Sequence, residues 1–331
     1  MVAQLDPAFK AISKRKTFTR LISYLFYEGR PLTTKGRWIN PFVFLLYRFQ
    51  RHLPFAKIVK DPVFILGTGR SGTTILGVTL GIHRDVGFLN EPKALWAYAY
   101  ESEDLIGSYN DGQAFYSINS DEATIEVKKR LHRVFGHYLR FSASSRVVDK
   151  YPELIFRVPF VREVFPGAKF IFLFRNGFDT CTSIEHWSAR LGVTKDGEIH
   201  DWWGKDDRKW KLLCDQIVAE DTVLGKHAGV IRAYSDHKLR AAVEWIVTMK
   251  KGLELTDRYP EIVLPVRYED YVGEERVRDQ VIEFCGLDED KNYSEYCKAV
   301  LTPVEPKAEV SLPPEIQSEF SRVMSLLGYE R

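Results

Sequence analysis

Short apolar runs alternate along most of the chain with segments whose apolar residues recur at helical spacing. Continuous apolar runs of this kind are typical of strands buried on both faces of a parallel sheet. We expect such strands at 63–66, 86–89, 146–150, 169–174 and 262–266. The amphipathic segments predict helices at 74–82, 121–140, 153–165, 178–189, 236–259 and 275–285, and a last one within 311–327. The alternation of strand and helix predicts an α/β fold with a doubly wound parallel sheet.

A glycine-rich turn, GTGRSG at 67–72, separates the first predicted strand from the helix that follows it. Its outer glycines have the spacing of a P-loop, but Thr73 stands where the P-loop pattern has a lysine. Backbone N–H groups of such a turn point at an anion, and Arg70, Thr73 and Thr74 add charge and hydroxyl donors. We therefore favour a P-loop-like anion site over a βα turn without a ligand.

Charged residues come directly at the ends of the other predicted strands. Glu91, Lys150 and Arg175 occupy such positions. Because the carboxyl ends of parallel strands lie at one edge of a sheet, we expect these side chains to converge near the glycine-rich turn. The polar, irregular stretch 191–235 is interpreted as an insertion that shapes the site of a second substrate.

The amino-acid composition argues against some classes of protein. The chain has 331 residues, 45% of them hydrophobic and 28% charged, as expected of a globular protein. Its net charge of only +2 argues against a dedicated nucleic-acid binder. The four cysteines form neither a C-x-x-C pair nor a metal-binding pattern, which favours free thiols in a reducing compartment. With no visible signal peptide and no long apolar run, we expect a cytoplasmic protein without a membrane span.

The first 60 residues differ from the rest of the chain. They contain 12 Lys/Arg and 2 Asp/Glu, whereas the remainder carries a net charge of −8. Two aromatic, apolar patches at 21–27 and 38–47 are each flanked by basic residues. Two interpretations are open: a basic helical extension packed on the main domain, or amphipathic helices that lie on an anionic membrane surface.

Five motifs carry a resemblance to a known family. In chain order they are GTGRSGTTIL, FLNEP, DKYPE, FPGAKFIFLFRNGFDTCTSIEHW and LPVRYEDYV, spread over residues 61–287. Their order resembles the sulfotransferases that use 3′-phosphoadenosine 5′-phosphosulfate (PAPS), and the R-S-G-T-T loop is most similar to the tyrosylprotein and bacterial branch. Together with the composition of the first 60 residues and the polar stretch after 190, the resemblance indicates a basic aromatic N-terminal extension at 1–60 and a sulfotransferase domain at 61–331, with the acceptor-site insertion near 191–235.

The resemblance also implies how PAPS is held. The 5′-phosphosulfate loop is formed by Arg70, Ser71, Gly72, Thr73 and Thr74. Arg175 and Ser183 match the pair that binds the 3′-phosphate, a task for which the planar guanidinium of arginine is suited. Tyr268 matches a position near the adenine. From the residues alone, Arg175 could equally pair with Asp179, and Tyr268 could be an aromatic packed at a strand end.

Two further residues match catalytic positions of the family. Glu91 corresponds to the general base that takes the proton from the acceptor hydroxyl, although a structural ion pair is the alternative. Lys150 corresponds to a lysine that stabilises charge on the sulfuryl group or on the leaving phosphate oxygen. Fixed donors of this kind supply electrostatic stabilisation without Mg²⁺, so no metal is expected.

We therefore predict an enzyme that transfers a sulfuryl group from PAPS to a hydroxyl of an acceptor, by in-line displacement. The acceptor class (glycan, lipid, small molecule or peptide) and the oligomeric state stay open. The alternatives are a small-molecule kinase with a degenerate P-loop and a non-enzymatic membrane-surface protein.

Overall fold

Five parallel strands form the centre of the molecule. The computed structural model describes residues 2–195, 197–303, 305–306 and 309–329. The strands are β1 (Val63–Gly67), β2 (Val86–Asn90), β3 (Arg146–Lys150), β4 (Lys169–Phe174) and β8 (Val263–Arg267), in the order β2-β3-β1-β4-β8. Every residue of β1 is buried, because the strand lies between β3 and β4 in the middle of the sheet. Each predicted strand is present, so the α/β, parallel-sheet prediction is confirmed.

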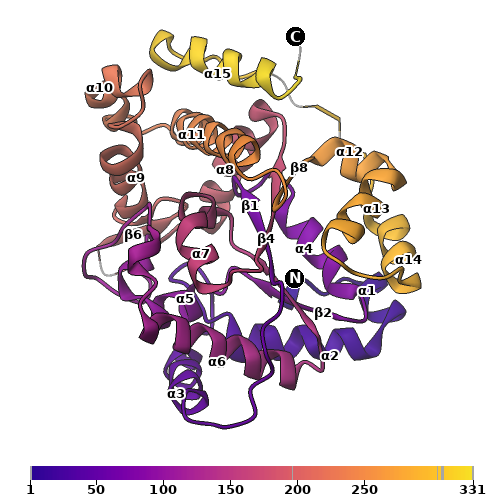
Figure 1. Ribbon diagram of the computed structural model, residues 1–331. Helices are drawn as coiled ribbons and strands as arrows, with labels where there is room; N and C mark the ends of the chain where they lie inside the picture. The colour runs from indigo at the N-terminus through magenta and orange to yellow at the C-terminus, as the bar shows by residue number, and fades with distance from the viewer. Residues whose placement is uncertain (1, 196, 304, 307–308, 330–331) are drawn as a thin grey trace.

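Helices cover both faces of this sheet (Figure 1). Val63 and Ile65 point into one apolar core, whereas Phe64 and Leu66 point into the other. The first core is covered by α1 (Pro7–Ile12), α4 (Thr73–Ile82), α12 (Tyr268–Gly273), α13 (Glu275–Phe284) and α14 (Lys291–Val300). The second is covered by α5 (Lys93–Ala99), α6 (Ile125–Phe141), α7 (Val158–Val164), α8 (Gly177–Leu191), α11 (His237–Arg258) and α15 (Pro314–Leu326).

Local chemistry moves some helix boundaries away from the predicted ones. The helix expected at 153–165 is divided into a 3-10 helix, η6 (Pro152–Arg157), and α7. Pro159 lies in the first turn of α7, where a proline is tolerated because that N–H has no helical partner. Helix α6 begins four residues later than predicted because the hydroxyl of Thr124 caps it by accepting a hydrogen bond from Val127 N.

The insertion after α8 combines a small sheet with helical turns. It contains the antiparallel strands β5 (Val193–Lys195), β6 (Glu198–Asp201) and β7 (Gly204–Lys205). These are followed by α9 (Arg208–Leu213), η7 (Cys214–Val218), η8 (Leu224–His227) and α10 (Ala228–Arg232). Trp203 and Trp210 are fully buried in it and meet edge to face, so the insertion is anchored to the main core.

The N-terminal segment lies along β2, the edge strand of the sheet. It forms α1, α2 (Lys14–Ile22), the π-helical turn η2 (Ser23–Tyr27), η3 (Arg37–Ile39) and α3 (Asn40–Gln50). Lys16 Nζ donates a hydrogen bond to Val86 O, and Glu28 Oε1 accepts one from Asn90 N at 2.7 Å. Side chains of this segment therefore occupy backbone groups that an edge strand otherwise leaves unpaired. No helix within the described residues is both long enough and apolar enough to cross a bilayer.

Candidate active site

The glycine-rich turn between β1 and α4 has the backbone geometry of an anion cradle. Gly67 and Gly72 have φ values of +140° and +89°, which disfavour residues with a side chain. Gly72 is also the N-cap of α4, where no side chain caps the helix. The first N–H groups of α4 are thus left for a ligand. The buried hydroxyl of Thr68 in the same turn has no hydrogen-bond partner, which also fits an anionic ligand.

Glu91 follows β2 in an unusual backbone conformation. Its φ is +49°, and its N–H donates to Lys150 O at 2.7 Å. Its carbonyl in turn accepts from Lys93 N at 2.7 Å, which closes a tight turn around Pro92. This turn directs the carboxylate to the carboxyl edge of the sheet, where its side chain keeps 35% of its surface exposed.

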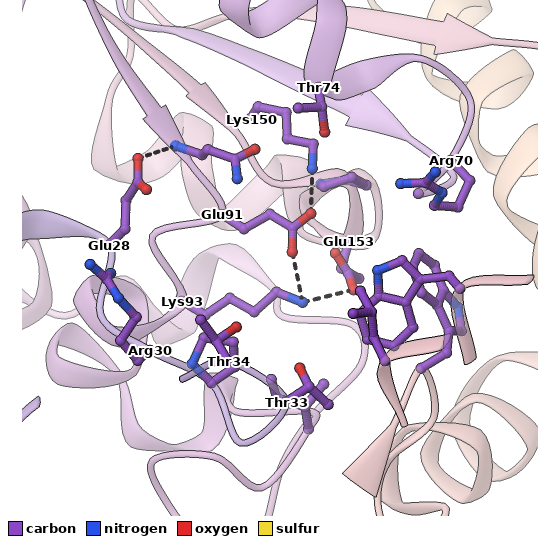
Figure 2. Close-up of a pocket in the computed structure, with 18 of the residues that line it drawn as sticks. Glu28, Arg30, Thr33, Thr34, Arg70, Thr74, Glu91, Lys93, Lys150 and Glu153 are labelled. Carbon is purple, nitrogen blue, oxygen red and sulfur yellow. Dashed lines mark hydrogen bonds and ion pairs between the residues drawn. The ribbon is translucent and has the colours of Figure 1, made fainter. Parts of the chain in front are cut away.

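Two ammonium groups flank the Glu91 carboxylate (Figure 2). Lys150 Nζ contacts Oε1, and Lys93 Nζ lies 3.4 Å from Oε2. Burial by itself raises the pKa of Glu91, but the positive charges of Lys150 and Lys93 outweigh it and hold the pKa below its usual value. The carboxylate is therefore ionised at neutral pH.

The ion pairs continue beyond Lys93. Glu153 lies 3.2 Å from both Lys93 Nζ and Lys209 Nζ, and Lys209 Nζ lies 2.6 Å from Glu244 Oε1. Charges of alternating sign thus connect β3, α5, η6, α9 and α11. This network could not be predicted from the sequence, because nothing in the spacing of Lys93, Glu153, Lys209 and Glu244 indicates that they meet.

A cavity of about 480 Å³ opens above these groups. Arg70, Thr74, Glu91 and Lys150 line it, so two of the three strand-end residues expected to converge do meet here, whereas Arg175 lines a second cavity. Two other parts of the chain complete its wall: Arg30, Thr33 and Thr34 from the N-terminal segment, and Trp187, Arg190 and Trp202 from α8 and the insertion. Figure 2 shows Arg30, Thr33 and Thr34 on the side of Glu91 that faces away from Thr74.

Trp202 connects the insertion to the glycine-rich turn. Its ring lies so close to Gly69 that a Cβ there would come within 2.4 Å of it. Trp187 meets the same ring edge to face at 5.3 Å between ring centroids, and Trp202 Nε1 donates to Glu244 Oε2 at 2.9 Å. The indole is thus held in place between the turn and the ion-pair network.

A second cavity, of about 140 Å³, contains Arg175 and Tyr268. Arg175 Nη2 lies 2.9 Å from Asp179 Oδ2, so the pairing considered as an alternative is present. Its buried Nε has no hydrogen-bond partner and is available to a ligand. The Tyr268 ring lies 4.7 Å from the Arg175 guanidinium and also packs against Gly72, so it separates this cavity from the glycine-rich turn.

Not all residues of the expected loop and 3′-phosphate pair face a cavity. Ser183 Oγ accepts a hydrogen bond from Arg70 Nε at 3.1 Å, and Ser183 lines neither cavity. Ser71 is buried with its Oγ 3.4 Å from Thr180 Oγ1, and Thr73 is buried at the start of α4. Among the described residues, no group of three or more His, Cys, Asp or Glu side chains is placed to hold a metal ion.

Comparison with known proteins decides the family. A model of the "Sulfotransferase family" matches residues 62–226, about half of the chain, including the glycine-rich turn, Glu91, Lys150 and Arg175. The chain belongs to the sulfotransferase family. It is therefore a transferase, in a family that uses PAPS as sulfuryl donor. The similarity to the tyrosylprotein branch stays a prediction.

Solved structures similar to this sulfotransferase include several bacterial ones. The sulfotransferase domain from the curacin biosynthetic pathway is 16% identical, with a TM-score of 0.48, over 83% of this chain and 99% of that one. The sulfotransferase domain of the Synechococcus PCC 7002 olefin synthase is 16% identical, with a TM-score of 0.46, over 84% and 98%. A sulfotransferase from Mycobacterium avium is 13% identical, with a TM-score of 0.45, over 98% and 96%. A search of curated proteins found no match.

Proposed function

We propose that this sulfotransferase transfers the sulfuryl group of PAPS to an acceptor hydroxyl bound in the larger cavity, with Glu91 as general base. One observation carries the proposal. The Glu91 carboxylate faces the same cavity as Arg70 and Thr74 of the anion cradle and contacts Lys150. A hydroxyl in this cavity can therefore approach a base on one side and the phosphosulfate loop on the other.

The two cavities suit the two ends of the donor. The open N-terminus of α4 and the side chains of Arg70 and Thr74 offer donors to the 5′-phosphosulfate. The unpartnered Nε of Arg175 offers a charge-assisted hydrogen bond to the 3′-phosphate. Tyr268 contacts both Gly72 and Arg175, so a nucleotide that reaches from one site to the other passes its ring. Ser183 stays a candidate for the same phosphate.

In this reaction Glu91, Arg70 and Lys150 each have a separate role. The acceptor oxygen forms a bond to sulfur while the bond between sulfur and the 5′-phosphate oxygen breaks, and the hydroxyl proton passes to Glu91. Arg70 and Lys150 stabilise the negative charge that develops on the sulfuryl and phosphate oxygens. As those oxygens draw the Lys150 ammonium away, Glu91 loses part of the charge that lowers its pKa and becomes a stronger base during the step.

The state of the four cysteines indicates the cellular compartment in which the protein works. Cys181, Cys214, Cys285 and Cys297 all lie within the described residues, and each is a buried free thiol. Unpaired thiols support a reducing, cytoplasmic compartment.

Sulfur-labelled PAPS, offered with a panel of glycan, lipid, phenol and peptide acceptors, tests the function directly. The wild type should label one acceptor class, and Glu91→Gln should lower kcat by about 10²–10⁴-fold, the usual contribution of a general base. Calorimetry should show that both proteins bind adenosine 3′,5′-bisphosphate equally, and more tightly than ATP with Mg²⁺. A variant with unchanged turnover would remove Glu91 from the mechanism, and tighter binding of ATP with Mg²⁺ would revive the kinase alternative.

A further inference from the structure

The outer face of α3 and the turn before it expose a row of large apolar side chains. Trp38, Phe42, Leu45 and Phe49 follow one another at intervals of four, three and four residues, which places them on one side of the helix. Between 60% and 75% of each side chain is accessible to solvent. Exposed leucines are common singly, but an unbroken aromatic and aliphatic row is the mark of an interaction surface.

The opposite face of α3 is fixed to the protein. Val43, Tyr47 and Gln50 are buried. Tyr47 Oη donates to Tyr27 O at 2.6 Å, and Gln50 Nε2 donates to Tyr27 Oη at 2.7 Å. The helix is thus apolar on both sides, although the described residues cover only one of them. A helix that is apolar all round is normally enclosed on every side.

The same surface continues into the connection between α3 and β1. Phe55 and Ile58 are 74% and 88% exposed. Their backbone is held against α6, since Lys57 N donates to Gly136 O at 3.2 Å and Lys57 Nζ donates to Ser144 O at 2.8 Å. Figure 1 shows α3 and this connection together at the lower end of the molecule. The six side chains expose on the order of 800 Å² of apolar surface, more than the patches of a few hundred Å² on ordinary monomers.

The charges that residues 29–60 themselves carry have one sign. From residue 29 to residue 60 the chain has seven Lys/Arg residues and neither Asp nor Glu. Arg51 is paired with Glu126. Lys35, Arg37, Arg48 and Lys60 are exposed beside the apolar row. Long basic side chains can lay their alkyl stems along an apolar surface and keep their charge at its rim.

We propose that Trp38, Phe42, Leu45, Phe49, Phe55 and Ile58 form a docking face for an anionic lipid bilayer, with α3 lying in the plane of the interface. An apolar helix face rimmed by cations combines the two contributions that hold such helices on membranes, burial of apolar area and attraction to anionic headgroups. A second copy of the chain fits less well. A symmetric dimer through this face would set the same cations against each other across the interface.

Vesicle flotation with the full-length protein tests the docking face. The probes are vesicles of phosphatidylcholine alone and of phosphatidylcholine mixed equally with phosphatidylglycerol. The wild type should float with the mixed vesicles. The triple variant Phe42→Ser, Leu45→Ser, Phe49→Ser should lose at least about tenfold in partition coefficient. Arg48→Gln and Lys60→Gln should each lose about fivefold on the mixed vesicles, and little on the neutral ones.

A matched triple variant controls for the loss of exposed apolar surface in general. Ile199→Ser, Val230→Ser, Leu326→Ser removes side chains of 52–56% exposure from β6, α10 and α15, and it should bind vesicles like the wild type. Adenosine 3′,5′-bisphosphate should bind every variant equally, which reports on folding independently of lipid. A wild type that stays off the mixed vesicles overturns the proposal. So does a wild-type dimer that becomes a monomer in the α3 variant by light scattering, because a second copy would then cover the face.

Discussion

Arg70 and Glu91 are held in backbone conformations that residues with side chains seldom adopt. Their φ values are +71° and +49°, and both side chains line the larger cavity. Each such conformation costs about 1–3 kcal/mol, which the surrounding structure has to offset. Strain at two facing residues of one cavity supports a role for them in binding or catalysis rather than in folding.

The low pKa of Glu91 has a consequence for the pH dependence of turnover. Burial alone raises this pKa, and Lys150 with Lys93 lowers it by more. Since the base is then ionised well into the acid range, kcat/KM should stay flat from neutral pH down to about 5. Lys150→Met removes one of the two charges, so the acid limb of the profile should move to higher pH. An acid limb that does not move would show that Lys150 does not lower the pKa of Glu91.

Arg175 should act on one phosphate only. Arg175→Gln removes the charge whose Nε lies unpartnered in the smaller cavity. The affinity for adenosine 3′,5′-bisphosphate should fall by roughly 10–100-fold, as expected for charge-assisted hydrogen bonds. Adenosine 5′-monophosphate lacks the 3′-phosphate and should bind both proteins alike by calorimetry. An equal loss for the two ligands would place Arg175 elsewhere on the nucleotide.

At the scale of elements, the N-terminal helices are part of the sheet's architecture. The Arg20–Glu28 pair is almost completely buried, with a second contact of 2.9 Å between Nη2 and Oε2. Glu28 also accepts the hydrogen bond from Asn90 N in the edge strand. One buried carboxylate therefore connects α2, η2 and the end of β2, one residue before Glu91.

Removing that carboxylate should be costly. Glu28→Ala leaves Asn90 N without its acceptor and the buried Arg20 without its carboxylate partner, and we expect the free energy of unfolding to fall by about 3–5 kcal/mol. The matched control is Glu126→Ala, which breaks partly exposed pairs to Arg51 and Arg130 and should cost about 0–1 kcal/mol. Urea denaturation measures both. Similar losses in the two variants would mean that the buried pair does not hold the N-terminal segment on the sheet.

Which segments form helices and which form strands was predictable from periodicity. The side-chain contacts between elements far apart in the sequence were not. The strand-end position of Glu91, Lys150 and Arg175 follows from apolar runs that end in charge, and the structure does place Glu91 and Lys150 at one cavity. Ser183 illustrates the limit. The family resemblance implies a ligand shared with Arg175, and only the structure shows that the Ser183 hydroxyl accepts a hydrogen bond from Arg70.

Over the whole molecule, one wall of the larger cavity was predictable and the other was not. The wall at the glycine-rich turn is built from one strand, turn and helix that are contiguous in sequence, together with the ends of neighbouring strands. The rest of the wall brings together Thr33, Lys93, Trp202 and Lys209, from segments with no common pattern. Such contacts depend on how the N-terminal segment and the insertion pack, which local periodicity does not encode.

The covered strand β2 has a counterpart at the other edge of the sheet. There β8 carries Pro265, in register with Phe172 of β4, and a proline has no N–H to offer to a further strand. Side chains occupy one edge and a proline interrupts the other, so the sheet is poorly suited to strand addition from another molecule. Fibril-like growth and strand exchange between copies are thereby disfavoured, even in a chain that exposes a large apolar face elsewhere.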